Sequence, residues 1–218
     1  MSSFPKSVGL GGLLMVMASL CGWTSCSDDE AVPAPVRFDL CEVVTGTDGY
    51  ALSYVMDDGQ RLLPANKFRQ LRPDTTYRAL LGYQINHEGK AAVHQLSMML
   101  APLARRYGQE QLRTDPVRIT SLWRSARYVN LRVGIPRSGQ HAHYLGFHEV
   151  GVQHNADSTR TLELQLFHDA RGDREDFYED VTLSCPLYPY AKQLRAGTDS
   201  VAMWVQTSAG RQRTAWRY

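Results

Sequence analysis

The sequence YRALLGYQINHEGKAAVH, residues 77–94, carries the clearest folding signal in the chain. Between Tyr77 and Ile85 every second residue is apolar or aromatic, so these side chains point to one face of an extended strand. Glu88 and Gly89 follow, and an X-Gly pair supplies the positive φ that a tight hairpin turn requires. The stretch therefore predicts an antiparallel β-hairpin.

The same two signals recur along the rest of the chain. Alternating apolar residues occur in 129–135, 162–166 and 201–205, and the residues between core positions, Arg78 among them, are expected to point the other way. Helical periodicity is confined to 100–107. These patterns predict an all-β protein with an antiparallel meander as its topology. Further X-Gly turn pairs are Asp48-Gly49, Asp58-Gly59, Ser138-Gly139 and Ala209-Gly210.

The N-terminus has the pattern of a secretory signal. Lys6 precedes an apolar run over 8–20, then come small residues and Cys26. The apolar run is short for a membrane-spanning helix. The segment resembles a bacterial lipoprotein signal, in which the cysteine thiol is acylated before the preceding peptide bond is cut. It predicts a signal peptide over 1–25 and lipidation of Cys26, with fatty chains such as palmitate as the membrane anchor.

An acidic segment follows the predicted lipidation site. Ser27, Asp28, Asp29 and Glu30 resemble the export signal that sends lipoproteins of Bacteroides-type bacteria to the cell surface. A solvated tether is the alternative interpretation, and prolines further along make 26–36 an extended spacer. The predicted location is the cell envelope, with a surface-exposed outer-membrane position favoured.

The remaining cysteines and the overall charge exclude little. Cys41 and Cys185 could pair in an oxidising envelope, but Cys41 lies in an apolar strand pattern, which favours a small buried hydrophobe. The whole chain has 24 basic and 22 acidic residues. A charge so near zero implies no polyanionic partner.

Several short segments follow one another in a recognisable order. They are Asp57-Asp58-Gly59, Asp115-Pro116-Val117, Leu122-Trp123, Tyr128-Val129-Asn130-Leu131, His168, Gly172-Asp173 and Asp199-Ser200-Val201. In their order and spacing these segments resemble the NigD-like family of Bacteroides-type lipoproteins. The resemblance implies an N-terminal OB-like barrel over 37–105 and a C-terminal β-sandwich over 115–218, and the polar stretch 106–114 is the predicted linker.

The family resemblance implies an accessory role more than an activity, because the family takes its name from a bacteriocin-associated gene cluster. The sequence has no G-x-S-x-G, H-E-x-x-H, P-loop or G-x-G-x-x-G motif, so a non-enzymatic protein without a cofactor is predicted. Expected partners are a protein, a peptide or a glycan. The envelope location argues against nucleic acid. A structural envelope component is a further alternative.

Two constellations suggest other chemistry. His141 and His143 lie two apart and could share a metal on one strand face, which would suit a metal-assisted hydrolase. Solvated histidines after a turn are the simpler interpretation. Residues 171–173 spell Arg-Gly-Asp, an integrin-binding tripeptide that here is expected to be a glycine-centred bend.

Overall fold

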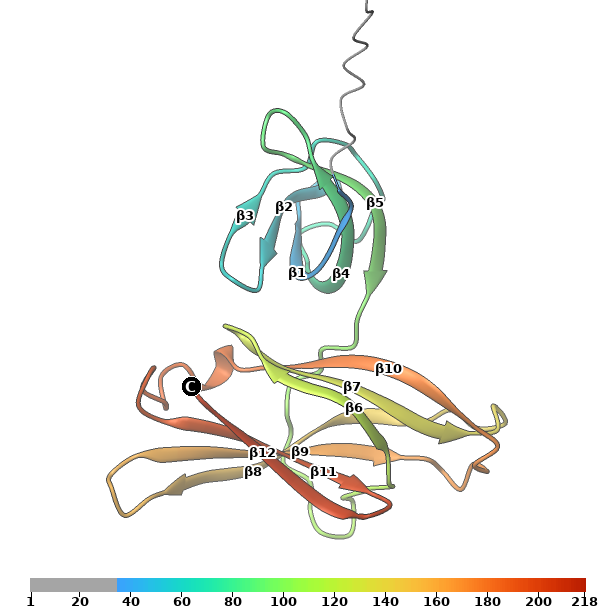
Figure 1. Cartoon of the computed structure of the whole chain (residues 1–218), viewed down its shortest axis with the longest axis vertical. Helices are drawn as coiled ribbons and strands as arrows, with labels where there is room; N and C mark the ends of the chain where they lie inside the picture. The colour runs from blue at the N-terminus through green and yellow to red at the C-terminus, as the bar shows by residue number, and fades with distance from the viewer. Residues whose placement is uncertain (1–34) are drawn as a thin grey trace, which may run out of the picture. The chain divides into compact units, whose positions relative to one another are not determined.

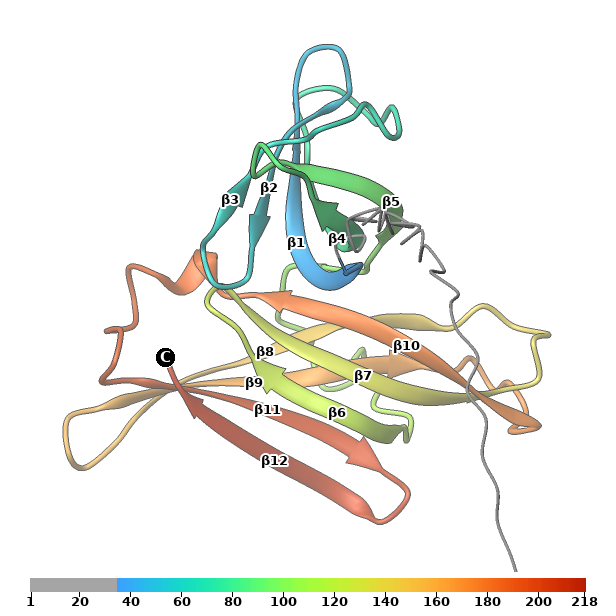
Figure 2. The same cartoon turned by 45° about the horizontal axis from the view of Figure 1, so that its top comes forward.

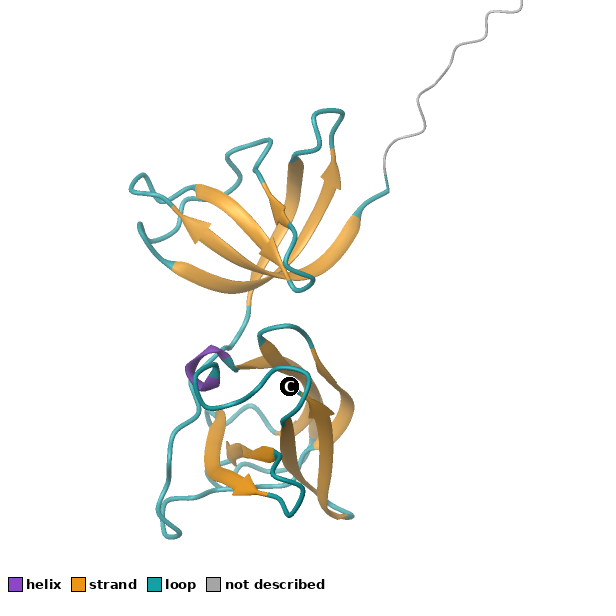
Figure 3. Ribbon diagram, turned by 90° about the vertical axis from the view of Figure 1, so that its left-hand side faces the viewer, coloured by secondary structure: helices purple, strands orange, loops and turns teal. Residues whose placement is uncertain are grey.

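The computed structural model describes residues 35–218, so Cys26, the predicted export signal 27–30 and the predicted signal peptide lie outside the described residues. The predicted all-β class is confirmed: strands account for nearly all regular structure here, with a single 3₁₀ turn at Tyr188–Tyr190 (Figure 3). No helix in this part of the chain is long and apolar enough to cross a membrane.

The first five strands form a curled sheet with the order β3-β2-β1-β4-β5 (Figure 1). All neighbouring strands of this sheet pair antiparallel, and β1 pairs with both β2 and β4. The strands are β1 (Arg37–Thr45), β2 (Ala51–Met56), β3 (Arg61–Leu62), β4 (Thr76–Ile85) and β5 (Ala91–Met98).

An isolated parallel bridge between Pro64 and Ala91 brings the two edges of this sheet together. Ala91 N donates to Leu63 O at 2.9 Å, and Ala65 N donates to Ala91 O at 2.8 Å. Closure of a five-stranded antiparallel sheet in this way gives the OB-like barrel that was predicted. The barrel core consists of Cys41, Val43, Tyr54, Met56, Leu62, Ala79, Leu81, Tyr83, Ala91 and Val93.

The remaining seven strands form two sheets packed face to face, a β-sandwich as predicted (Figures 1 and 2). One sheet has the order β10-β7-β6 and the other β12-β11-β9-β8. The alternating residues at 129–135, 162–166 and 201–205 all contribute to the core between them. The strands are β6 (Arg118–Arg124), β7 (Tyr128–Arg137), β8 (Tyr144–His154), β9 (Arg160–Asp169), β10 (Phe177–Pro186), β11 (Ser200–Thr207) and β12 (Gly210–Arg217).

The predicted meander is wrong within the sandwich. β7 and β8 belong to different sheets, so the Ser138-Gly139 pair lies in a crossover and not in a hairpin. β9 and β11 are parallel neighbours. A parallel pair needs a long crossover connection, which β10 in the facing sheet supplies. Alternation along a strand reports which face is buried, and it carries no information about which strand lies beside it.

The other predicted turn pairs join strands that do pair, and their glycines all have positive φ. Gly49 has φ 77°, and a Cβ atom there would lie 2.3 Å from the Leu71 carbonyl oxygen. Only glycine can occupy that position without moving the backbone.

Residues 100–114 run along the sandwich. Isolated parallel bridges join Leu100 to Leu183, Arg105 to His148 and Thr114 to His168. The predicted domain limits at 105 and 115 stay predictions, but the segment between them is hydrogen-bonded to the sandwich sheets.

Candidate binding site at the junction of the two domains

Arg78 lies near the start of β4 and is 5% exposed, although it points away from the barrel core. Its guanidinium forms a bidentate ion pair with Asp57, directly after β2. Nη1 donates to Oδ1 at 2.5 Å and Nη2 donates to Oδ2 at 2.8 Å. This is the fork geometry in which arginine binds carboxylate most strongly.

The same guanidinium also bonds to the sandwich. Arg78 Nε donates to Ser184 Oγ at 3.2 Å, and Nη2 donates to Asn130 Oδ1 at 3.1 Å. Ser184 on β10 and Asn130 on β7 are fully buried, and the serine hydroxyl donates to the asparagine at 2.7 Å. A charge removed from water must be paired and hydrogen-bonded, and here the partners come from both domains.

A second carboxylate joins β1 to the sandwich beside Arg78. Glu42 accepts from Tyr128 OH at 2.7 Å and from Arg127 Nη1 at 2.8 Å. The Arg78 guanidinium lies 4.0 Å from the centre of the Tyr128 ring. Burial and then the Glu42 contact raise the pKa of Tyr128, so its hydroxyl remains a donor. We call Glu42, Asp57, Arg78, Asn130, Tyr128 and Ser184 the junction cluster.

A cleft of about 470 Å³ adjoins the junction cluster. Asp57 contributes both to its wall and to the ion pair with Arg78. The barrel supplies most of the lining and the sandwich supplies Trp123 and Ser125. The volume lies within the usual range for ligand sites, and junctions between domains are a common place for them.

Phe38 is the most exposed aromatic residue of the cleft, at 56%. It pairs with Gly82 across β1 and β4, and a Cβ atom on Gly82 would lie 2.8 Å from the Phe38 ring. The glycine therefore leaves room for the ring to lie against the strand. Phe38 is exposed yet held in place.

Two carboxylates of the cleft have no cation partner. Asp39 accepts from Tyr83 OH at 3.0 Å, and Asp58 accepts from the Gln60 backbone N–H at 2.8 Å. Neither forms an ion pair with any residue in 35–218. The cleft thus combines exposed aromatic surface with two carboxylates outside ion pairs, and Arg37 adds one positive charge to the same lining.

The predicted metal candidates lie elsewhere and do not act together. His141 is exposed, whereas the His143 side chain is only 2% exposed. His143 Nδ1 lies 2.9 Å from His168 Nε2 and its Nε2 lies 3.2 Å from Asp173 Oδ2, so both ring nitrogens are already in contacts. No three His, Cys, Asp or Glu side chains within 35–218 are placed to hold a metal ion.

The Arg-Gly-Asp tripeptide forms a bend, with Gly172 at φ 71°. The Asp173 carboxylate is fully buried and accepts from the Ser138 hydroxyl and backbone N–H. An integrin ligand must present that carboxylate to solvent. The tripeptide is therefore a turn whose aspartate contacts the protein's own loop.

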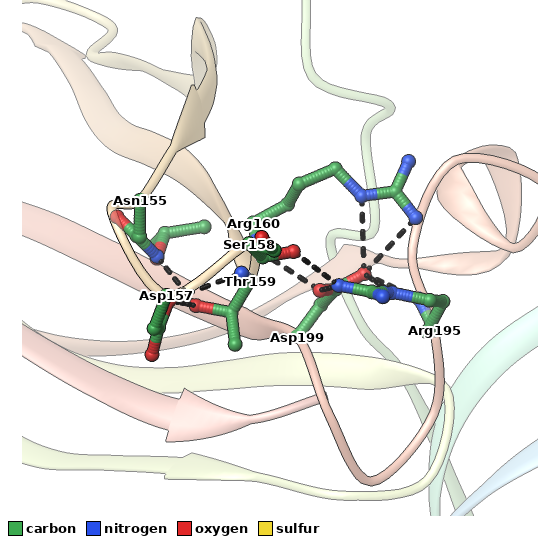
Figure 4. Close-up of polar contacts among 8 residues, drawn as sticks. Asn155, Asp157, Ser158, Thr159, Arg160, Arg195 and Asp199 are labelled. Atoms are coloured by element: carbon green, nitrogen blue, oxygen red, sulfur yellow. Dashed lines mark hydrogen bonds and ion pairs between the residues drawn. The ribbon is translucent and has the colours of Figure 1, made fainter.

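Asp199, from one of the family-like segments, is also fully buried and holds two loops together (Figure 4). It accepts from the backbone N–H of Arg195 at 2.7 Å and of Arg160 at 2.9 Å, and both guanidinium groups contact it. Hydrogen bonds from the Arg195 side chain are the main cause of its pKa lying below the ordinary value. This residue supports the fold, not the cleft.

Cys41 and Cys185 are free and lie in different cores, one in the barrel and one in the sandwich. Burial raises the pKa of Cys41 to about 12 and also raises the pKa of Cys185. Both behave as small buried hydrophobes, which is the role favoured from sequence.

Sequence reasoning missed the junction cluster. Arg78 was expected simply to face away from the core, and nothing was inferred for Asn130. The sequence did contain a signal, because each of these polar residues has an apolar or aromatic residue on either side within a strand pattern. A polar residue so placed is a candidate for a second buried surface.

Comparison with known proteins gives the family. Residues 100–218 match the model of the NigD-like C-terminal beta sandwich domain. The search for curated proteins gives no match.

Three solved structures share the fold. A NigD-like immunity protein from Bacteroides caccae is 22% identical with TM-score 0.65, and it covers 84% of this chain and 93% of its own. A protein named as toxin-related from Parabacteroides distasonis is 21% identical with TM-score 0.67 over the same shares. A protein named as a lipoprotein from Bacteroides fragilis is 11% identical with TM-score 0.57, covering 84% of this chain and 96% of its own. Because the family model spans more than half of the sequence, this chain belongs to the NigD-like family.

Proposed function

We propose that this protein is a lipid-anchored, non-enzymatic accessory protein of the cell envelope that binds a protein or peptide partner in the junction cleft. The observation that carries the proposal is the cleft itself. It is lined by both domains, and the same Asp57 that forms part of its wall pairs with the buried Arg78.

The chemistry of the cleft indicates the kind of segment it would accept. Phe38 and Trp123 offer apolar ring surface, and Asp39 and Asp58 offer charge without a cation. A partner segment with a basic residue beside apolar ones satisfies both features, through ion pairs and cation–π contacts. A neutral or acidic segment would leave the carboxylates desolvated and unpaired.

The names of structural relatives support the biological setting. One is an immunity protein, one is named as toxin-related and one as a lipoprotein. With the lipoprotein signal ending at Cys26, and with Ser27 and the acidic residues 28–30, they support an envelope protein that meets a peptide or protein outside the cytoplasm, at the outer membrane surface. Recognition, and not catalysis, is the role that the cleft supports.

Photocrosslinking in intact cells tests the proposal. A benzophenone amino acid replaces Phe38 in the cleft or, as a matched control, Phe177 on β10, since the two phenylalanines are 56% and 52% exposed. We expect one specific adduct from position 38, absent from position 177 and weakened by Asp58→Asn. Equal labelling at both positions, or none at 38, would refute binding in the cleft.

A further inference from the structure

Three close contacts in series link buried side chains of the sandwich. The Asp115 carbonyl oxygen lies 3.0 Å from His168 Nδ1, and His168 Nε2 lies 2.9 Å from His143 Nδ1. His143 Nε2 lies 3.2 Å from Asp173 Oδ2. His143 belongs to the β7–β8 loop and Asp173 to the β9–β10 loop. Because His168 lies on β9, the three contacts connect both loops to that strand.

The groups at the two ends of this series of contacts determine how many protons the series contains. The carbonyl oxygen of Asp115 can only accept, so His168 must donate to it from Nδ1. His168 Nε2 then accepts from His143 Nδ1, and the third contact needs another N–H or O–H between His143 and Asp173. Three hydrogen bonds require three protons, whereas two neutral imidazoles supply only two.

The contacts of Asp173 locate the additional proton. Its carboxylate accepts from the Ser138 backbone at 2.9 Å, from the Ser138 hydroxyl and from the Gly139 backbone at 3.3 Å. The Ser138 hydroxyl is the main cause of the pKa of Asp173 lying below its ordinary value. A carboxylate that accepts this many hydrogen bonds is ionised, so Asp173 has no proton to donate. The third proton therefore belongs to the histidine pair.

The other charged groups around the pair leave this assignment intact. The Asp115 carboxylate accepts from the Ala170 N–H at 2.6 Å, and Asp169 on β9 adds a further negative charge near His168. Arg171 is exposed and lies against the Tyr144 ring. Burial lowers the pKa of His168, which disfavours a positive charge on that ring.

We propose that His143, His168 and Asp173 form a proton-dependent clamp that holds the β7–β8 loop against the β9–β10 loop. In the folded protein the two imidazoles together carry three protons, one more than two neutral rings would carry. Titration belongs to the coupled pair and not to either ring alone. In the unfolded chain both histidines lose their protons above about pH 6.5. Above that pH the clamp therefore requires a proton that the unfolded chain lacks, so it weakens as pH rises.

Chemical unfolding of the full-length protein between pH 5.5 and 8.5 tests the clamp. The variants are His143→Gln and, as a control two residues away, the exposed His141→Gln. We expect the ratio of the unfolding equilibrium constant of His143→Gln to that of wild type to stay unchanged below about pH 6.5. It should then fall by up to about tenfold per pH unit above it. His141→Gln should track wild type throughout.

A second measurement does not depend on the variant folding. ¹⁵N–¹H spectra of histidine-labelled wild type near pH 7 should show three ring N–H protons shared by the two buried histidines, with both nitrogens of one ring protonated. Two protons, or a relative unfolding constant for His143→Gln that does not change with pH, would overturn the proposal.

Discussion

Arg78 hydrogen-bonds to residues of both the barrel and the sandwich. Its side chain is 1% exposed, and its guanidinium bonds to Asp57 in the barrel and to Ser184 and Asn130 in the sandwich. Removing it would leave the Asp57 carboxylate without its cation and the buried Ser184 without the Arg78 donor, and Asn130 would keep only the hydrogen bond from Ser184. Such a loss lowers the free energy of unfolding by more than the intact ion pair contributes to it.

Arg78→Met removes the charge and the hydrogen-bond donors but keeps most of the side-chain volume. It should therefore lower the free energy of unfolding by about 3 kcal/mol. Arg132→Met is the matched control. Its ion pair with Asp180 is about half exposed, so the loss should be under about 1 kcal/mol. Urea unfolding at pH 7 measures both. Equal effects for the two variants would contradict the role given to Arg78.

At this scale the sequence predicts core residues well and polar partners poorly. Alternation marks Leu81 and Leu131 as core correctly, since burial follows from strand periodicity. The pairing of Arg78 with Asn130 depends on two strands 52 positions apart meeting across a domain junction. No local pattern encodes that meeting.

At the scale of elements, turn chemistry is local and so it is predictable. The X-Gly pairs give positive φ where expected, as at Gly49 and Gly89. Strand neighbours are not local, which is why the parallel pairing of β9 with β11 was missed. The loop before β11 depends on Asp199, whose contacts hold it to the β8–β9 hairpin.

Asp199→Asn should remove a pH-dependent part of the stability. The pKa of Asp199 is depressed in the folded protein, mainly by hydrogen bonds from Arg195. Its contribution is thus fully present above the ordinary aspartate pKa, about 3.9, and it is lost as pH falls through the folded value. Acid unfolding followed by circular dichroism should show a shallower pH dependence below about pH 4 in the variant than in wild type. Identical acid transitions would contradict this assignment, and exposed Asp176→Asn is the control.

At the scale of the whole molecule, the membrane anchor is a separate proposal from the fold. Cys26→Ser should abolish incorporation of labelled palmitate and release the protein from the membrane fraction, because it removes the thiol whose acyl chains supply the membrane affinity. Cys41→Ser is the control, since Cys41 is buried in the barrel core and should not be acylated. Palmitate labelling that survives Cys26→Ser would place the anchor elsewhere.

The cleft keeps its shape only if the barrel and the sandwich move as one body. ¹⁵N relaxation of backbone amides measures this directly, as the rotational correlation time of β1–β5 compared with that of β6–β12. We expect one common value in wild type and in Arg132→Met, and two different values in Arg78→Met. Two independent values in the wild-type protein would contradict a fixed junction and the binding site built on it.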